Sequence, residues 1–318
     1  DAVCAQIEST LDGIRGREDE CECEIAFFGG SFTGIPREEL TALLELARPY
    51  VDDGRVASLR CSTRPDYIDK EIIDLLLRYR MTTVELGVQS TSAEVLRRCE
   101  RGHTAEQSLA ALRMIRESGM HAVGQMTGCD IIGAGADGAR IYPTMTFAGT
   151  ALEGMLRRGE YMPPSTAETV ERVADLCELF DKAGVPVIRI GLCYGEGLTG
   201  EDGIVAGDYE CAVGEMAQSE VFLRRLRALL ADEKVTGTAG AEEPDAVSND
   251  ISADDTGSAH SPGSTGIRTL TVCCPRGRTS QVIGHRRANA ETLRREYGIG
   301  RLRVREDDSL CGYELRRC

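Results

Sequence analysis

Short apolar runs alternate with amphipathic stretches through the first 190 residues of the chain. The apolar runs are rich in β-branched residues and predict strands, at 24–28, 56–61, 83–88, 121–126, 138–141 and 186–190. The amphipathic stretches have helical spacing and predict helices at 37–47, 69–79, 92–99, 104–117 and 166–183. Thr104 is expected to cap its helix, because Gln107 follows at the capping-box spacing. Repeated strand–helix–strand units predict parallel strands with right-handed crossovers, so the fold class is α/β, either a β/α barrel or an open doubly wound sheet.

The pattern breaks at residues 236–266, where Gly, Ser, Thr, Asp and Pro dominate and only Val247 and Ile251 are large and apolar. This composition predicts a flexible acidic linker. Beyond it, a small α+β module is expected, with strands at 269–273, 301–305 and 313–316 and a helix at 288–297. We therefore expect a barrel domain over 1–235, a linker over 236–266 and a C-terminal module over 267–318.

The charge distribution limits the classes of partner. The net charge of −15 argues against a protein that holds nucleic acid by uniform attraction, although residues 267–318 alone carry 12 Arg against 6 acids. No apolar run approaches the roughly 20 residues of a membrane span, and no secretory segment is evident. The 13 cysteines are scattered rather than paired in a disulfide pattern, so a reducing cytoplasm and mostly unreactive thiols are expected.

Polar and glycine-rich segments stand where several predicted strands end, as in proteins that assemble a site from loops at one sheet edge. They are Phe28–Gly34, Ser62–Tyr67, Glu85–Ser90 and, before a helix, Arg101–Thr104. Gly29-Gly30 matches neither a phosphate-binding loop nor a dinucleotide fingerprint, and by itself it equally suits a tight turn. Arg101 could clamp a carboxylate or be a solvated charge, and His103 suits a helix start without chemistry.

Taken in order, these segments resemble one known family. The sequences FFGGSFTG, STRPDY, ELGVQS, RGHT, RIYPT (from Arg140) and RIGL (from Arg189) occur in the order found in radical S-adenosylmethionine (SAM) proteins related to the catalytic subunit of Elongator. The resemblance covers roughly residues 24–230, and the tail from Ser264 resembles that of bacterial members without an acetyltransferase domain. It implies a partial parallel β/α barrel that binds SAM and a 4Fe-4S cluster.

The resemblance also assigns site residues. Gly29, Gly30 and Ser31 would contact the amino group of SAM. Ser62, Thr63 and Gln89 would lie near its ribose, and Arg101 would face its carboxylate. These residue types suit the task, because backbone carbonyls accept hydrogen bonds from an ammonium and a guanidinium binds a carboxylate through two hydrogen bonds.

Two departures from the family shape the expectation. The family's cluster ligands form Cys-x3-Cys-x2-Cys upstream of the Gly-Gly strand, whereas here only Cys4, Cys21 and Cys23 stand upstream, at other spacings. We therefore expect an N-terminal truncation, no metal ligands and no activity from this chain alone. The short connection after Gln125 is expected to have lost most of a crossover helix and to leave sheet surface uncovered.

The expected function is radical modification of a substrate, with the wobble uridine of tRNA as leading candidate. Intact relatives would also need an electron donor, and no membrane partner is expected. One alternative is an oxygen-independent coproporphyrinogen oxidase-like enzyme, which shares Gly-Val-Gln at the corresponding strand end. Another is a non-catalytic relic that binds RNA or a protein partner.

Overall fold

The computed structural model describes residues 2–16, 22–126, 130–192, 198, 203–207, 209–236 and 268–318. Apart from Thr236, the predicted linker lies outside these residues. The chain divides into two compact units, 1–217 and 218–318, and each is described by itself. No helix in the described ranges is both long and apolar enough to cross a membrane.

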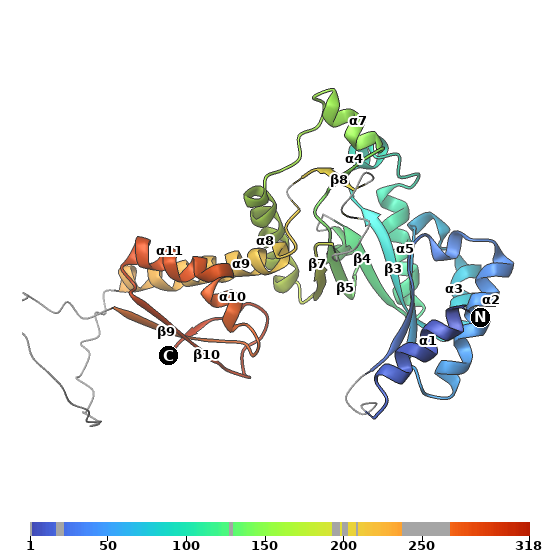
Figure 1. Ribbon diagram of the computed structural model, residues 1–318, viewed down its shortest axis with the longest axis horizontal. Coiled ribbons are helices and arrows are strands. Elements are labelled where there is room, and N and C mark those ends of the chain that lie inside the picture. The colour runs from blue at the N-terminus through green and yellow to red at the C-terminus, as the bar shows by residue number, and fades with distance from the viewer. Residues whose placement is uncertain are drawn as a thin grey trace, which may run out of the picture. The chain divides into compact units, whose positions relative to one another are not determined.

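A six-stranded sheet forms the centre of the first unit (Figure 1), with the order β1-β2-β3-β4-β5-β7 and every neighbouring pair parallel. Its strands are β1 Glu24–Phe27, β2 Ser58–Thr63, β3 Met81–Gln89, β4 His121–Met126, β5 Gly138–Ile141 and β7 Val187–Ile190. All six predicted strands are confirmed within a few residues. The parallel order places all their carboxyl ends at one edge, as in the half-barrel implied by the sequence.

Helices cover one face of this sheet. In Figure 1, α2, α3 and α5 gather on the same side of it, where they pack against β2, β3 and β4, and α8 packs against β7. The helices of this unit are α1 Ala2–Gly13, α2 Arg37–Asp52, α3 Lys70–Arg78, α4 Ala93–Arg98, α5 Ala105–Glu117, α6 Asp130–Gly133, α7 Ala151–Arg157 and α8 Thr166–Lys182. A two-stranded antiparallel pair, β6 Thr146–Phe147 and β8 Ile204–Ala206, completes it. The predicted helices are present, whereas α1, α6 and α7 were not foreseen.

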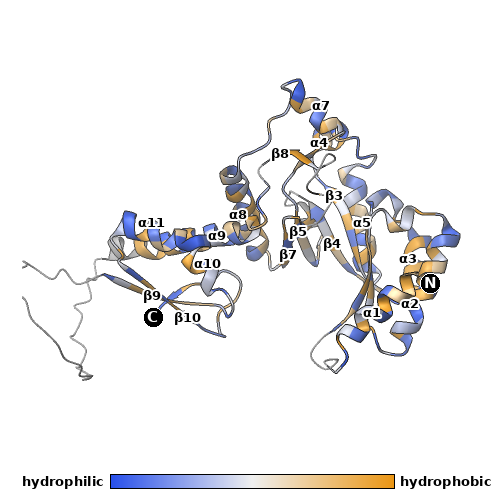
Figure 2. Ribbon diagram, in the orientation of Figure 1, coloured by the Kyte–Doolittle hydropathy of each residue, from blue (hydrophilic) through white to orange (hydrophobic). Residues whose placement is uncertain are grey.

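The helix starts follow from local chemistry. Thr104 and Gln107 form the predicted capping box of α5, and Ser165 forms a second one at α8. Asp69 accepts a hydrogen bond from the Ile72 N–H at the start of α3. α3 then turns Ile72, Ile73, Leu75 and Leu76 into the core, and it is mostly hydrophobic in Figure 2.

The shortened connection after β4 corrects one expectation. A single helical turn, α6, follows the strand, and Ile131 within it is fully buried. A Cβ at Gly124 of β4 would lie only 2.7 Å from the Ile131 Cδ1, so this side chain packs directly on the strand backbone. The turn therefore covers the sheet at this point, although a full crossover helix is missing.

The second unit packs helices on a three-stranded sheet with the order β10-β9-β11. Its elements are the part of α9 (Val213–Thr236) from Gln218 onward, β9 Thr269–Cys274, α10 Thr279–Ile283, a 3-10 turn at His285–Arg287, α11 Ala288–Tyr297, β10 Arg301–Glu306 and β11 Arg316–Arg317. The buried Asn289 amide donates hydrogen bonds to the carbonyls of Ser219 and Val282, which ties α11 to α9 and α10. The compact unit thus includes most of α9.

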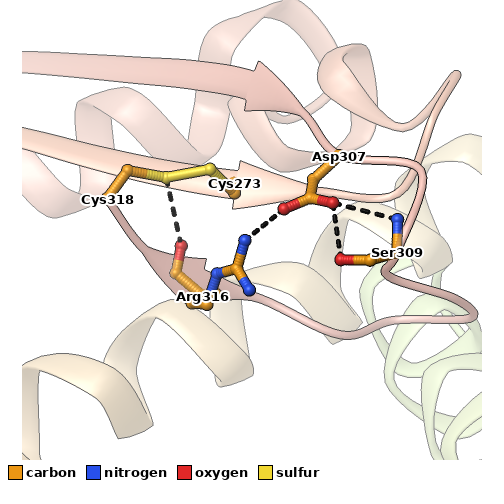
Figure 3. The surroundings of a disulfide bond; sticks show 5 residues. All are labelled: Cys273, Asp307, Ser309, Arg316 and Cys318. Carbon is orange, nitrogen blue, oxygen red and sulfur yellow. Dashed lines mark hydrogen bonds and ion pairs between the residues drawn. A yellow bond between two sulfur atoms is a disulfide. The ribbon is translucent and has the colours of Figure 1, made fainter.

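Helices α9 and α10 were not predicted, and two further features of this unit differ from the expected pattern. The last strand covers only Arg316–Arg317, because the Tyr313 ring is buried against Phe222, with centroids 5.3 Å apart, instead of joining the sheet. A disulfide joins Cys273 to Cys318 (Figure 3). The two cysteines are 45 residues apart in the sequence, and no spacing pattern indicated that they pair. Other cysteines, such as Cys61 and Cys177, are buried thiols as expected.

Candidate functional site

The carboxyl ends of the first three strands of the large sheet form the candidate site. β1 ends at Phe27 and continues into Gly29-Gly30, β2 ends at Thr63, and β3 ends at Gln89. Thr63 pairs with Leu86 in the parallel register, so Gly87 and Gln89 extend just beyond it. The fold therefore brings the predicted residues of three separate motifs to one edge.

Gly29 and Gly30 present an open stretch of backbone. Gly29 has a φ of +107°, a conformation that suits glycine, and both residues are exposed. A Cβ at either position would meet nothing within 4 Å. Ser31 is half-buried and makes no side-chain cap for the 3-10 turn Phe32–Gly34 that follows it. Nothing in the described structure fills the space beside this backbone.

A strained turn fixes Gln89 at the end of β3. Its φ is +66°, and the Ser90 N–H donates a 2.8 Å hydrogen bond to the Val88 carbonyl, closing a γ-turn of the rare positive-φ kind. The same carbonyl lies 3.2 Å from Nε2 of His103, which is only 6% exposed. Strained backbone of this type persists where its surroundings hold it, and it concentrates at functional sites. His103, given no chemical role from the sequence, holds the turn that carries Gln89.

Three predicted residues converge around Gly87. A Cβ there would lie 3.3 Å from the Gln89 Nε2, 3.7 Å from the Thr63 carbonyl oxygen and 3.9 Å from the Arg101 Nη2. Gly87 is buried, so the absence of a side chain lets the amide and the guanidinium approach the strand end. The ELGVQS motif therefore needs its glycine for packing at the site, a role that sequence spacing did not reveal.

Arg101 is a half-buried cation with spare hydrogen-bonding capacity. Its Nε is buried and has no hydrogen-bond partner among the described residues. Burial, followed by the charge of Arg64, lowers the pKa of Arg101. Both effects disfavour the cation, and a bound anion would relieve both. The carboxylate of an amino acid matches this guanidinium in charge and in geometry.

Ser62 and Thr63 point to different surroundings. The Thr63 side chain is buried, with its hydroxyl 2.7 Å from that of Thr33, which in turn donates to the Tyr67 carbonyl. Thr63 therefore offers the site its carbonyl, while its hydroxyl supports the loop. Ser62 lies on the other side of the strand, where its hydroxyl accepts a 3.4 Å hydrogen bond from the Gln125 amide.

A charged cluster that the sequence analysis missed lies on the sheet face shared with Ser62. The Glu85 carboxylate has no solvent exposure, and it lies 2.7 Å from the Arg140 Nε and 3.1 Å from the Arg60 Nη1. It also accepts a 3.0 Å hydrogen bond from the Gln125 amide. Arg140 in turn lies over the Phe28 ring, with its guanidinium carbon 5.6 Å from the centroid. The sequence signal for this cluster was a charged residue within each of three predicted strands, namely Arg60, Glu85 and Arg140.

The described residues do not offer ligands for an iron-sulfur cluster. No group of three His, Cys, Asp or Glu side chains within them could hold a metal ion. Cys23 stands just before β1 and Cys4 lies in α1, whereas Cys21 is outside the described residues. The site thus contains groups suited to an amino-acid-bearing ligand, and no described set suited to a cluster.

Comparisons with known proteins identify the family of this chain. Residues 7–131 match the radical SAM superfamily model and residues 136–222 match the Radical_SAM C-terminal domain model. A tRNA uridine(34) acetyltransferase of Methanocaldococcus jannaschii is 34% identical over 137 residues, which are 38% of this chain and 25% of that protein. Human Elongator complex protein 3 is 31% identical over 135 residues, or 37% of this chain and 24% of that protein.

The fold has a counterpart among solved structures. Elp3 of Methanocaldococcus infernus, with an N-terminal deletion, matches with a TM-score of 0.56 and 24% identity over 70% of this chain and 58% of that chain. The chain spans about a quarter of the length of the curated relatives it matches. These matches favour the Elongator side over the coproporphyrinogen oxidase alternative. The chain belongs to the radical SAM superfamily, and its N-terminal part is homologous to Elongator complex protein 3 and the archaeal tRNA uridine(34) acetyltransferases.

Proposed function

We propose that the carboxyl-terminal edge of the half-barrel binds SAM for radical modification of an RNA substrate, with a tRNA uridine as the leading candidate. The observation that carries the proposal is the buried Arg101 Nε, which has no hydrogen-bond partner among the described residues, at the edge where Gln89 and the open Gly29-Gly30 backbone also lie. The family uses SAM together with a 4Fe-4S cluster, and this chain's edge fits SAM.

Each residue has a distinct part in binding. The Gly29-Gly30 carbonyls accept hydrogen bonds from the SAM ammonium, and Arg101 binds its carboxylate. The Gln89 amide, held by the γ-turn, bonds the ribose hydroxyls. Ser31 contributes a hydroxyl directly after the Gly-Gly backbone, Thr63 contributes a carbonyl, and Ser62 contributes a hydroxyl on the side of the Gln125 amide. These residues would together hold SAM at the carboxyl ends of the strands.

The 4Fe-4S cluster enters the proposal only as a property of the radical SAM family. When bound, it supplies the electron that cleaves SAM. Because the described residues hold no ligand set for it, the proposal covers SAM binding and orientation by this chain and derives no step through the cluster. Uridine as substrate follows from the names of the archaeal relatives, which are matched over only part of their length.

The Gly-Gly edge gives a clean test by calorimetry with SAM. Gly30→Val adds a side chain where the chain itself leaves open space, so the fold should tolerate it while SAM affinity falls by about tenfold or more, equal to about 1.4 kcal/mol. Gly13→Val is a matched control, because Gly13 also has an ordinary φ and open surroundings. Equal SAM affinity in both variants would contradict the assignment.

A further inference from the structure

The edge strand of the C-terminal unit carries a row of arginines on one face. Arg301, Arg303 and Arg305 alternate along β10 with Leu302 and Val304, so the three side chains share a face. All three arginines are exposed, whereas the two apolar residues between them are half-buried. α10 and α11 pack on this strand. The sheet therefore has one face toward its helices and one that carries the arginine row.

The row continues into a hollow at its first residue. Arg301 lines a depression of about 280 Å³ together with Glu291 and Arg294 of α11 and with Arg287, which lies in the turn directly before that helix. Three guanidinium groups and one carboxylate therefore surround this space. Arg301 thus belongs to both the row and the hollow, which together make up the basic surface of this unit.

This basic surface is not neutralised within the described part of the chain. None of its five arginines, at 287, 294, 301, 303 and 305, forms an ion pair with a described acid. Glu291 lines the hollow itself, whereas two other nearby acids are engaged elsewhere. Glu306 accepts hydrogen bonds from the Gly277 N–H and the Thr279 hydroxyl, and Asp307 pairs with Arg316 (Figure 3). The surface is thus free to bind an external polyanion.

We propose that this surface binds the phosphate backbone of RNA. Arginines at every second residue of a strand are about 6.7 Å apart, so the row spans roughly 13 Å, enough to contact several successive phosphates of one strand. Guanidinium groups bind phosphate oxygens in bidentate fashion. Strands β9, β10 and β11 contain no aromatic residue that could stack on a base. The binding is therefore insensitive to sequence and strongly dependent on salt.

An acidic protein is the other partner that such a charge could attract. The regular spacing and the absence of large apolar residues on the arginine row favour RNA, because protein interfaces rely on buried apolar and aromatic anchors. The inference rests on the proposed RNA substrate but not on SAM binding, which occupies the first unit. It assigns to the C-terminal unit the task of holding RNA while chemistry takes place elsewhere.

The test measures binding of a fluorescently labelled RNA hairpin to the full chain by anisotropy, between about 50 and 200 mM salt. The triple variant Arg301→Gln, Arg303→Gln, Arg305→Gln should lower affinity on the order of a hundredfold at about 0.1 M salt. The slope of log K against log salt should fall by about 2 to 3, as expected for three lost phosphate contacts. Changing the hairpin sequence should leave the affinity of the parent chain unchanged.

A second triple variant, Arg276→Gln, Arg286→Gln, Arg295→Gln, removes the same charge from exposed positions of the same unit outside the row and the hollow. It should keep most of the affinity and the slope. Three results would overturn the inference. They are equal losses of RNA affinity in both triple variants, no RNA binding by the parent chain, and polyglutamate binding that is as tight as RNA binding and is also abolished in the row variant. SAM calorimetry on the row variant separates the two proposals, because it should match the parent chain.

Discussion

The buried Glu85 cluster permits the most quantitative prediction. Glu85→Gln removes a carboxylate with no solvent exposure whose oxygens lie 2.7 Å from Arg140 and 3.1 Å from Arg60. Breaking a buried ion pair by removing one partner costs about 3–5 kcal/mol, because a charge is left without its counterion. Arg60 keeps a contact of 2.8 Å with Glu24, and Arg140 is 13% exposed. The low end of that range, about 3 kcal/mol, is therefore expected.

Denaturant unfolding followed by circular dichroism checks this value. Glu94→Gln is the control, because the Glu94–Arg97 pair is 60% and 72% exposed, and its unfolding midpoint should not move. Adding Arg140→Met to Glu85→Gln should restore part of the stability, since it removes the orphaned cation. A loss below about 1 kcal/mol for Glu85→Gln, or no recovery in the double variant, would refute the account of the cluster.

Two further predictions concern His103 and Cys61. His103→Phe should lower SAM affinity several-fold with a small effect on the unfolding midpoint, whereas His103→Gln, which keeps a donor for the Val88 carbonyl, should recover part of the affinity; equal affinities in the two variants would exclude a positioning role. Burial, followed by the charge of Glu85, raises the pKa of Cys61 to about 12, so its thiol should resist iodoacetamide at pH 9 while the exposed Cys99 reacts. Because the folded pKa is the higher one, this group stabilises the fold fully below about pH 9 and loses that contribution as pH rises toward 12; rapid alkylation of Cys61 in the folded chain would contradict this.

The fold was largely predictable because its signals are local. Apolar runs and capping residues such as Thr104 and Ser165 specify where strands and helices begin, and repeated strand–helix units then imply parallel pairing. The secondary-structure predictions failed where tertiary packing, rather than the local sequence, determines the structure. Tyr313 stands in a strand-like segment, yet its ring is buried against Phe222. Ile131 covers Gly124 from a single turn that has too little sequence for a periodic pattern.

The site was predictable in its location and less so in its contacts. Motifs at strand ends indicated the edge, and the structure brings Thr63, Gln89 and Arg101 together around Gly87. The sequence could not show that the Thr63 hydroxyl is hydrogen-bonded to Thr33. It also could not show that His103 holds the positive-φ turn at Gln89. Those facts depend on side-chain direction and on contacts between residues distant in the chain. The Glu85 cluster escaped notice for the same reason, since its members come from separate strands.

The pairing of Arg101 with the SAM carboxylate tests the central claim most directly. Calorimetry would compare SAM with decarboxylated SAM on the parent chain, on Arg101→Gln and on Arg101→Lys. The account predicts that the parent chain prefers SAM by about tenfold or more, that Arg101→Gln loses the preference and that Arg101→Lys keeps part of it. An unchanged preference in Arg101→Gln, or a parent chain that binds both compounds equally, would contradict the claim that this edge recognises SAM.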